Sequence, residues 1–216
     1  MRVRESYDAA AEAYAEHLCD ELDRKPLDRH LLNRFAEELA GQGTVAPDGA
    51  RPLIADLGCG PGHVAAYLEK RGARAIGVDL SPRMIAIASA RFPGVEFRVG
   101  DMRGLELADA SLAGAVLFYA IVHFEPGELA AAFAEVRRVL APGGLALVAF
   151  HAGDGVVHVD DLFGAPVSLD FRFHAPDAVA SALGAAGLPV IERVEREPYE
   201  GAEYPSRRCY LLARAA

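Results

Sequence analysis

The sequence predicts an α/β domain in which a doubly wound, mostly parallel seven-stranded sheet is covered by helices on both faces. Three observations lead to this expectation. From Arg51 onward, short β-rich runs alternate with segments of helical period, an order typical of parallel strands joined by right-handed crossovers. The chain has 216 residues, 52% of them hydrophobic and 25% charged, which suits one well-buried domain. A glycine-rich loop, "ADLGCGPG" at residues 55–62, follows the first apolar run, where ligands bind in such sheets.

Two helices are expected before the sheet. Residues 5–18 mix alanines with Tyr7 and Tyr14, whose seven-residue spacing puts both rings on one helix face. A second helix begins near Pro26, because its apolar residues recur four apart: Leu27, Leu31, Phe35 and Leu39. Residues 41–50 are rich in turn formers and end this helical segment. We expect residues 1–42 to form a helical lid.

Seven strands are then expected in order. The first five follow from the runs "PLIADL", "ARAIGVDL", "VEFRVGD", "LAGAVLFYA" and "GGLALVAFH", with the clearest intervening helix before the fifth. Residues 51–151 thus form the ligand-binding core. Two alternating stretches within residues 152–175 predict an inserted hairpin. Residues 176–216 supply a helix stopped by Gly187 and two closing strands, the last of them antiparallel.

Composition excludes several classes of function. The net charge of −9 and the pI near 5.3 disfavour a nucleic-acid or anionic-membrane surface, either of which needs a dense basic stripe. Three scattered cysteines, Cys19, Cys59 and Cys209, provide neither a disulfide framework nor a zinc ribbon. The N-terminus has no apolar signal core, and no apolar run approaches the roughly 20 residues of a membrane span. These features favour a cytoplasmic protein without nucleic-acid or membrane partners.

The glycine loop is compatible with two ligands, a dinucleotide or S-adenosylmethionine. A dinucleotide fingerprint places glycines at positions one, three and six, so that the helix N-terminus faces the pyrophosphate. Here position six is His63, and the glycines fall instead at every second position: Gly58, Gly60 and Gly62. The spacing disfavours a dinucleotide but does not by itself decide between the two ligands.

Four motifs in order resemble the class I S-adenosylmethionine-dependent methyltransferases. "ADLGCGPG" is similar to their first motif, D-x-G-x-G-x-G, and "GVDLSPRMIAIA" to the acidic end of strand two with its Ser-x-x-Met helix start. "VGDM" resembles the third, adenine-contacting motif, and "RVLAPGGLALV" the turn into strand five. The resemblance spans about residues 56–151. It implies a Rossmann-like sheet, S-adenosylmethionine as cofactor and a small-molecule type of methyltransferase.

The cofactor residues follow from these motifs. Asp79 can accept both ribose hydroxyls, and Asp101 can accept from the adenine amino group while the Met102 amide meets a ring nitrogen. Alternatively, Asp79 and Asp101 cap the helices that follow them. The resemblance implies that the glycine loop and Asp56 lie against the methionyl end, that an aromatic residue of the first helix closes that end, and that a basic residue before Pro26 meets the cofactor carboxylate. We therefore assign to the cofactor Asp56, Gly58, Cys59, Gly60, Gly62, Asp79, Leu80, Met84, Asp101, Met102, Phe118, Tyr14 and Lys25.

The acceptor site should lie near the end of strand four, which reads "FYAIVHF". It lacks the Asn/Asp-Pro-Pro-aromatic motif that grips a planar amine, so a small molecule is favoured over DNA, RNA or a protein amide. His123 is the candidate general base, although a histidine that merely orders the following turn would look the same. Tyr7, Tyr119 and His151 are candidate substrate contacts. The histidines lack metal-ligand spacing, so no metal is expected. Aromatic residues that could line the acceptor pocket are Phe118, Tyr119, Phe171, Phe173, Tyr199 and Tyr204.

Two other functions remain open at the level of sequence. The same fold can serve as a non-catalytic cofactor-binding module or scaffold, and a nicotinamide-dependent oxidoreductase is the third alternative. The acceptor and its reacting atom, oxygen, nitrogen or carbon, are not resolved by the sequence. The hairpin at residues 152–175 offers an edge for self-association, so the chain is expected to be a monomer or a homodimer.

Overall fold

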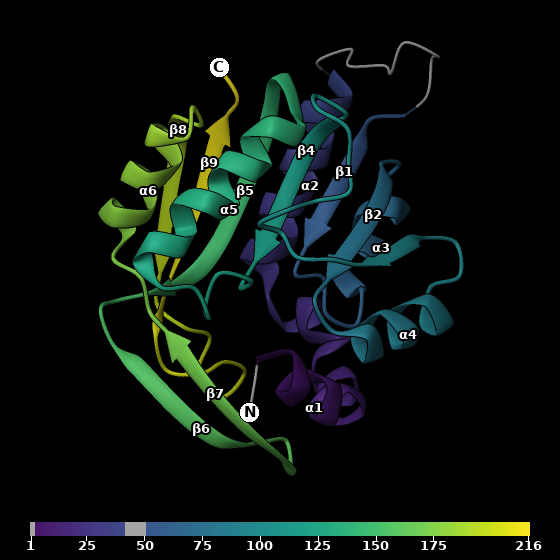
Figure 1. The fold of residues 1–216 in the computed structure, drawn as a ribbon, viewed down its shortest axis with the longest axis vertical. Coiled ribbons are helices and arrows are strands. Elements are labelled where there is room, and N and C mark those ends of the chain that lie inside the picture. The colour runs from purple at the N-terminus through teal and green to yellow at the C-terminus, as the bar shows by residue number, and fades with distance from the viewer. Residues whose placement is uncertain (1–2, 42–50) are drawn as a thin grey trace.

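The computed structural model describes residues 3–41 and 51–216, and the linker predicted at residues 41–50 lies outside them except for Gly41. A seven-stranded sheet runs through its centre in the order β3-β2-β1-β4-β5-β9-β8 (Figure 1). The strands are β1 (Leu53–Leu57), β2 (Arg74–Asp79), β3 (Glu96–Val99), β4 (Leu112–Phe118), β5 (Leu140–Ala152), β8 (Val190–Arg196) and β9 (Arg207–Arg214). β1 to β5 pair in parallel, while β9 is antiparallel to β5 and β8. The predicted doubly wound sheet is confirmed.

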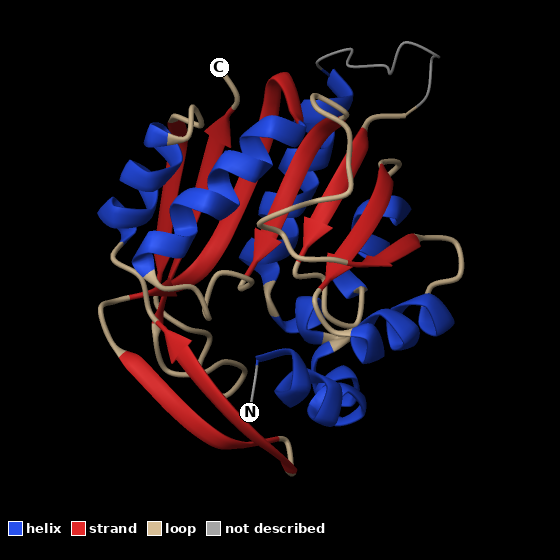
Figure 2. Ribbon diagram, viewed as in Figure 1, coloured by secondary structure: helices blue, strands red, loops and turns tan. Residues whose placement is uncertain are grey.

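Helices cover both faces of the sheet (Figure 2). α5 (Pro126–Val139) and α6 (Pro176–Ala185) bury Leu129, Phe133 and Leu183 against one face. α3 (His63–Lys70) and α2 (Pro26–Gly41) pack on the other, and the four-residue spacing of α2 buries Leu31, Phe35 and Leu39 there. α4 (Pro82–Arg91) lies beside β2 and β3. The apolar residues that recur at helical spacing in the sequence thus form the two layers of the core, one on each face of the sheet.

The helical segment before the sheet divides into two parts. α1 (Val3–Leu18) lies at the carboxyl ends of the strands, toward which the arrowheads of β1 and β4 point in Figure 1. A 3₁₀ turn, η1 (Glu21–Arg24), then leads to α2. Because α2 packs into the core, only α1 occupies the position expected of a lid. The expectation that both helices of residues 1–42 form the lid is corrected to this extent.

The inserted hairpin forms a separate two-stranded sheet of β6 (Val156–Leu162) and β7 (Ala165–Arg172). It packs against α1, where Ala10 is buried together with Val167 and Leu169. The hairpin leaves and rejoins the core at one point, because Ala152 and His174 form a bridge and the Gly153 amide donates to the His174 carbonyl at 3.1 Å. The hairpin therefore hangs below the sheet beside α1 (Figure 1).

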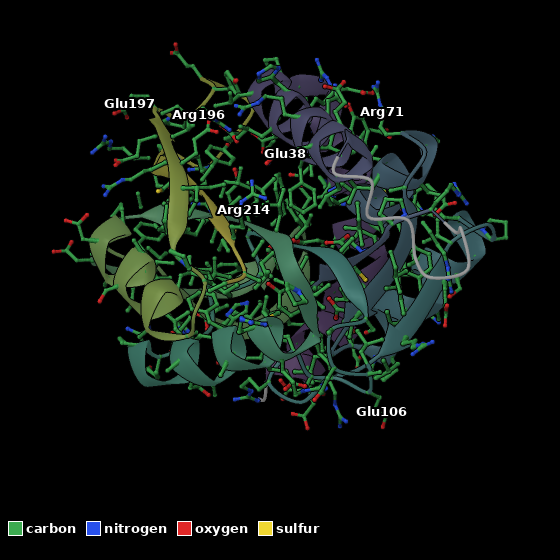
Figure 3. The ribbon with its side chains drawn as sticks, turned by 90° about the horizontal axis from the view of Figure 1, so that it is seen from above. Glu38, Arg71, Glu106, Arg196, Glu197 and Arg214 are labelled. Atoms are coloured by element: carbon green, nitrogen blue, oxygen red, sulfur yellow. The ribbon has the colours of Figure 1, made fainter. Side chains whose placement is uncertain are left out.

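Ion pairs fasten α2 to the antiparallel edge of the sheet. Arg214 of β9 reaches Glu38 of α2 at 2.6 Å, and Figure 3 shows this pair from above. Arg34 of α2 makes a second pair, with Glu192 of β8 at 2.8 Å. These pairs anchor α2 to the sheet, and Arg214 lies opposite Leu145 in the first half of β5, away from the strand ends where the site lies.

Candidate active site

The glycine loop leaves β1 and is held by the backbone of neighbouring strands. The amides of Gly58 and Cys59 donate to the Val78 carbonyl at 2.7 and 3.1 Å, and the Gly60 amide donates to Asp79 Oδ2 at 2.9 Å. Gly58 has φ +75°, and a Cβ there would lie 2.5 Å from that of Ala120. A Cβ at Gly60 would meet only Tyr14, at 3.7 Å. The loop is therefore tight at Gly58 and open above Gly60.

Gly62 serves packing and not the cavity. Its φ is +84°, and a Cβ would lie 2.6 Å from the Phe97 ring and 2.9 Å from Ala88. It begins α3 as the N-cap and lines neither cavity described below. Gly62 thus leaves room for the Phe97 ring of β3 and for Ala88 of α4, and its assignment to the cofactor stays a prediction.

Asp79 ends β2 with both carboxylate oxygens engaged by amides. Oδ2 accepts from Gly60, and Oδ1 accepts from Ser81 at 2.8 Å. Burial raises the pKa of Asp79, and the amides of Ser81 and Gly60 oppose that rise. Ser81, whose side chain accepts from the Met84 amide, is the N-cap of α4. The alternative in which Asp79 caps this helix is therefore wrong.

Asp101 stands at a turn with no helix after it, so the capping alternative is wrong here as well. Arg103 bonds both of its oxygens, with Nη2 at 2.6 Å from Oδ2. These hydrogen bonds from Arg103 lower the pKa of Asp101, which keeps it ionised. The Arg103 backbone amide also donates to Oδ1, at 2.9 Å.

The smaller of two adjoining cavities, about 130 Å³, follows the ends of β1, β2 and β4. It brings together most of the residues assigned to the cofactor, including both Asp79 and Asp101. The lining residues among those predicted are Tyr7, Tyr14, Gly58, Gly60, Asp79, Leu80, Met84, Asp101, Met102, Phe118, Tyr119 and His123. The sequence motifs therefore converge on one cleft.

The larger cavity, about 470 Å³, lies between the glycine loop, α1 and the hairpin. It contains four further predicted residues, Lys25, Asp56, Cys59 and His151, and most of its surface is apolar. Of the predicted aromatic residues only Tyr199 lies elsewhere, with Arg196 4.1 Å above its ring. Lining residues that sequence reasoning missed are Glu21, His63, Val157, Phe163, Glu203 and Arg208. Arg208 had a signal, namely a charge beside the apolar run "CYLLA" of a strand.

Asp56 and Cys59 form the floor of the larger cavity. Asp56 is 2% exposed, and its Oδ2 accepts from the Ala65 amide of α3 at 3.0 Å. Burial raises the pKa of Asp56 to about 7, because one amide and the nearby His63 only partly compensate for lost water. Burial also raises the pKa of Cys59 well above its usual value, so this thiol stays protonated.

Tyr7 and His123 form a hydrogen-bonded pair between α1 and the loop after β4. The Tyr7 hydroxyl lies 2.8 Å from His123 Nε2, and His123 Nδ1 lies 2.9 Å from the Asp170 carbonyl of β7. A carbonyl only accepts, so Nδ1 carries the hydrogen and Nε2 accepts from Tyr7. Burial lowers the pKa of His123 and raises that of Tyr7, so both are neutral. Tyr7 lines both cavities, whereas His123 lines only the smaller one.

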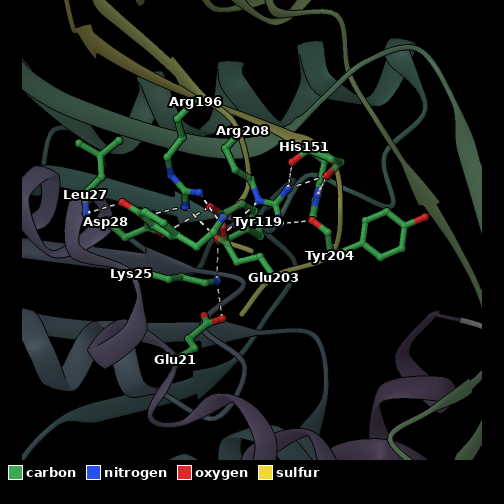
Figure 4. Close-up of polar contacts among 12 residues, drawn as sticks. Glu21, Lys25, Leu27, Asp28, Tyr119, His151, Arg196, Glu203, Tyr204 and Arg208 are labelled. Carbon is green, nitrogen blue, oxygen red and sulfur yellow. Dashed lines mark hydrogen bonds and ion pairs between the residues drawn. The ribbon is translucent and has the colours of Figure 1, made fainter. Parts of the chain in front are cut away.

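Lys25 belongs to a buried network of charges (Figure 4). Its Nζ lies 2.6 Å from Glu21 and 3.6 Å from Glu203, and 4.9 Å from the centroid of the Tyr119 ring. Glu203 also receives Arg196 at 2.5 Å. Lys25 is thus a fixed cation at the wall of the larger cavity, already paired with carboxylates.

The described residues offer neither a metal cluster nor a membrane-spanning helix. Within residues 3–41 and 51–216, no three histidine, cysteine or acidic side chains gather as a metal would require. Over the same part of the chain, no helix has the length and apolar character needed to cross a membrane.

A seven-stranded sheet of this topology with an acidic residue beside a glycine loop defines a class of enzyme. The chain belongs to the class I S-adenosylmethionine-dependent methyltransferases. Residues 54–144 match the family model described as a methyltransferase domain. The chain is 31% identical to a malonyl-[acyl-carrier protein] O-methyltransferase of Dechloromonas aromatica over 98% of its own length and 74% of that protein.

Other relatives match over shorter stretches or by fold. A demethylmenaquinone methyltransferase of Chlorobaculum parvum is 39% identical over 45% of this chain and 40% of that protein, so the match spans less than half of either. A solved S-adenosylmethionine-dependent methyltransferase of Methanosarcina mazei superposes with a TM-score of 0.68 at 20% identity, over 76% of this chain and 92% of that one. The last likeness concerns the fold alone. The family membership removes the oxidoreductase and scaffold alternatives in favour of a methyltransferase.

Proposed function

We propose that this enzyme methylates a small molecule bound in the larger cavity, with S-adenosylmethionine spanning the glycine loop. One observation carries the proposal: the two cavities share the wall formed by Tyr7, Tyr14, Gly58 and Gly60. An adenosyl group in the smaller cavity would present its methionyl end, and hence the methyl group, to the larger one. The reaction needs this arrangement, since donor and acceptor must meet in line.

The polar groups of the smaller cavity suit the cofactor. The open space above Gly60 leaves room for a ligand close to the backbone. The Asp79 carboxylate offers two oxygens for a diol, and the Asp101 carboxylate can accept from an amino group. Leu80, Met84 and Met102 supply apolar contacts for a planar ring. We assign Asp56 and Lys25 to the ammonium and carboxylate of the methionyl end.

S-adenosylmethionine, when bound, would supply a methyl carbon activated by a positively charged sulfur, with S-adenosylhomocysteine as the leaving group. The contribution of the chain is to orient the acceptor, exclude water and receive a proton where the acceptor carries one. α1 and the hairpin cover the cavity, so they exclude water. The residues that separate the two cavities, Tyr14 among them, hold the acceptor against the glycine loop.

The Tyr7–His123 pair is the proposed route for that proton. Tyr7 reaches the larger cavity, whereas His123 does not, so an acceptor hydroxyl or amine would give its proton to the Tyr7 oxygen. Tyr7 would pass its own hydrogen to His123 Nε2, with which it is already hydrogen-bonded at 2.8 Å. His123 then acts through Tyr7, and Asp170 keeps its ring oriented. The competing interpretation is that His123 only orders the loop before α5.

A small acceptor is favoured by the dimensions of the cavity. About 470 Å³ falls in the range of small-molecule sites. The relative from Dechloromonas aromatica is named for an acyl group on a carrier protein, so an acyl or acid group is one chemistry to test. The monomeric or homodimeric state stays a prediction.

Substitution of Asp79 tests the cofactor site. Asp79→Asn should weaken S-adenosylhomocysteine binding by about tenfold or more, because the buried carboxylate loses charged hydrogen bonds to the ribose. Isothermal titration calorimetry measures the affinity, and circular dichroism checks the fold. Asp109→Asn is the matched control, since Asp109 is 79% exposed and lies outside both cavities. Unchanged affinity in Asp79→Asn would remove Asp79 from the site, and no binding by the wild type would overturn the proposed function.

A further inference from the structure

The larger cavity ends in a polar wall that methyl transfer itself does not explain. His151, near the end of β5, lines this cavity, and its ring stacks on Phe173 with centroids 5.5 Å apart and planes 22° apart. Tyr119 and Tyr204 flank it at 5.3 and 6.3 Å. In Figure 4, His151 lies on the side of the network away from Asp28. The imidazole is thus fixed by three aromatic neighbours, although no buried carboxylate bonds it.

The hydrogen bonds of Ser206 allow a tautomer of His151 that leaves an N–H free on the other ring nitrogen. His151 Nδ1 lies 2.7 Å from Ser206 Oγ, and Arg208 Nη1 lies 2.6 Å from the same oxygen. Arg208 can only donate, so Ser206 accepts from it, and the Ser206 hydroxyl hydrogen can be donated to His151 Nδ1. In that tautomer Nε2 carries the ring hydrogen. Among the described residues Nε2 has no hydrogen-bond partner, and it is not among the fully buried atoms.

Arg208 and Lys25 are the cations that act most strongly on this imidazole. Arg208 is 2% exposed, its Nε makes no hydrogen bond to any described residue, and it approaches Glu203 only to 3.7 Å. Glu203 is shared with Arg196 and Lys25. Burial, followed by Arg208 and Lys25, lowers the pKa of His151 to about 3, whereas Glu203 and Glu21 oppose the shift less strongly. The imidazole is therefore neutral at physiological pH.

The rest of the cavity near His151 is apolar. The hairpin contributes Val157, Phe171 and Phe173, and Val122 lies on the core side. An occupant that satisfies this wall and this donor must have an apolar body and one oxygen acceptor, preferably charged.

We propose that His151, with Ser206 and Arg208 behind it, forms a subsite for an anionic oxygen of the methyl acceptor, so that the substrate class is an apolar or aromatic acid. This inference rests on the proposed function, because it assigns the larger cavity to the acceptor. A carboxylate is also present on the methionyl end of the cofactor. The shared chemistry is recognition of a carboxylate, and the experiment separates the two sources.

Two dyes with the same ring system test the subsite. 8-Anilinonaphthalene-1-sulfonate carries an anionic group, whereas N-phenyl-1-naphthylamine lacks it, and both fluoresce when bound in apolar sites. His151→Leu should lower the affinity for the anionic dye by about tenfold and that for the neutral dye by less than twofold, because one charged hydrogen bond is lost. His151→Gln, which keeps an N–H donor, should bind the anionic dye within threefold of wild type. Val157→Trp, which fills the cavity, should weaken both dyes.

His158→Leu is the matched control. His158 lies on the hairpin, is 50% exposed and lines neither cavity, so both dye affinities should stay unchanged. Equal loss of both dyes in His151→Leu, or no preference of the wild type for the anionic dye, would overturn the subsite. A tenfold loss of S-adenosylhomocysteine affinity in His151→Leu would also overturn it, by assigning the carboxylate to the cofactor. Failure of the wild type to bind S-adenosylhomocysteine is a separate result and contradicts the proposed function instead.

Discussion

At Asp56, burial disfavours the ionised carboxylate, which is the form that the proposed contact with the cofactor ammonium requires. Its pKa of about 7 means that burial has made the carboxylate costly to ionise. Of the charged groups nearby, His63 favours ionisation and Asp79 opposes it. A bound ammonium group beside Asp56 would favour the carboxylate, so cofactor binding and loss of a proton are linked.

That linkage predicts a pH dependence of cofactor affinity. Below pH 7 Asp56 is protonated and binds an ammonium poorly, so affinity for S-adenosylhomocysteine should rise as pH increases through 7, by about tenfold between pH 6 and 8. Calorimetry at four pH values measures the profile. Asp56→Asn should bind more weakly and with a flat profile over this range. A flat profile in the wild type would show that Asp56 does not meet the ammonium.

The Tyr7–His123 relay makes a prediction about additivity. Tyr7→Phe and His123→Ala should each lower kcat by about 10² or more, because general-base catalysis contributes on this scale. If the two residues act as one unit, the double variant should be no slower than either single one. Turnover is measured with radiolabelled cofactor and an acceptor found in a metabolite extract. Additive losses, or unchanged turnover in both single variants, would reduce the pair to a structural contact.

At this scale the motifs predicted which carboxylates gather, but not the surroundings of each. Asp79 and Asp101 sit at strand ends whose meeting follows from parallel topology. The steric role of Gly62 depends on Phe97, which lies 35 positions later in the sequence, so spacing alone could not separate it from Gly58 and Gly60. The Tyr7–His123 bond, across 116 residues, had no local signal either.

α1 and the hairpin are elements that hold each other over the site. Ser6 of α1 donates to the Ser168 carbonyl of β7 at 3.2 Å, and the His17 ring stacks on Phe163 at 4.4 Å with planes 9° apart. Phe163, at the hairpin turn, has a left-handed φ of +57°. On its other side α1 meets α4, where Ser81 donates to Asp8 at 2.6 Å. These contacts join α1 to the hairpin and to α4 beside the larger cavity.

Hydrogen exchange tests whether these elements order around the ligand. Saturating S-adenosylhomocysteine should slow amide exchange in residues 3–18 and 156–172, because a covering element is most easily opened when the cavity is empty. Residues 126–139 of α5, on the far face of the sheet, provide the internal control and should change little. Equal exchange with and without the ligand would make α1 and the hairpin a fixed scaffold.

Element types were predictable where a hydrophobic period was long. The stripe of α2 and the alternation of β6 and β7 were both read from the sequence and are confirmed. Their partners were not predictable, because an apolar stripe specifies burial but not the surface that buries it. For this reason α2 was expected over the site and instead packs on the sheet.

Across the whole molecule, one buried polar network joins the N-terminal segment to the last strands. Asp28 of α2 is fully buried and accepts from Arg196 at 3.0 Å and from the Tyr210 hydroxyl at 2.7 Å. Glu203 and Glu21 continue the network to Lys25. Breaking such a network leaves uncompensated charge in the interior, so it fixes where the N-terminal segment docks.

The network predicts how the stability of the fold responds to acid. Burial alone would raise the pKa values of Glu21 and Glu203, but hydrogen bonds from His63 to Glu21 and from Arg196 to Glu203, with Lys25 close to both, lower each to about 2. Both folded-state pKa values lie below the usual 4.5, so the stabilisation is present above pH 4.5 and lost as pH falls toward 2. Each group contributes on the order of 3 kcal/mol.

Urea unfolding between pH 7 and pH 3 measures this loss. The free energy of unfolding of the wild type should fall steeply below pH 4.5, and that of Glu203→Gln should be lower at pH 7 and less steep in acid. Glu197→Gln, at a 77% exposed position, is the control and should follow the wild type. Identical slopes for wild type and Glu203→Gln would show that the network does not govern acid stability.

The doubly wound, mostly parallel arrangement of the seven strands could be predicted, because alternating strands and helices with right-handed crossovers leave few topologies for this pattern. Long-range polar partners could not be predicted. Asp28 and Tyr210 are 182 residues apart, and no local pattern in either segment indicates that they are in contact. The fold could therefore be predicted from local patterns, whereas the docking of residues 3–41 depends on contacts between segments far apart in the sequence.

The root of the hairpin has an evolutionary consequence. Because the chain departs at Ala152 and returns at His174 through adjacent backbone hydrogen bonds, everything between them can be replaced without altering the register of the sheet. That interval contains Asp170, which orients His123, and Phe173, which stacks on His151. A grafted hairpin would therefore bring a new pocket shape together with a new setting for His123. Replacement of this interval as one segment would change the substrate range in descendants of this enzyme, while the residues assigned to the methyl donor stay unchanged.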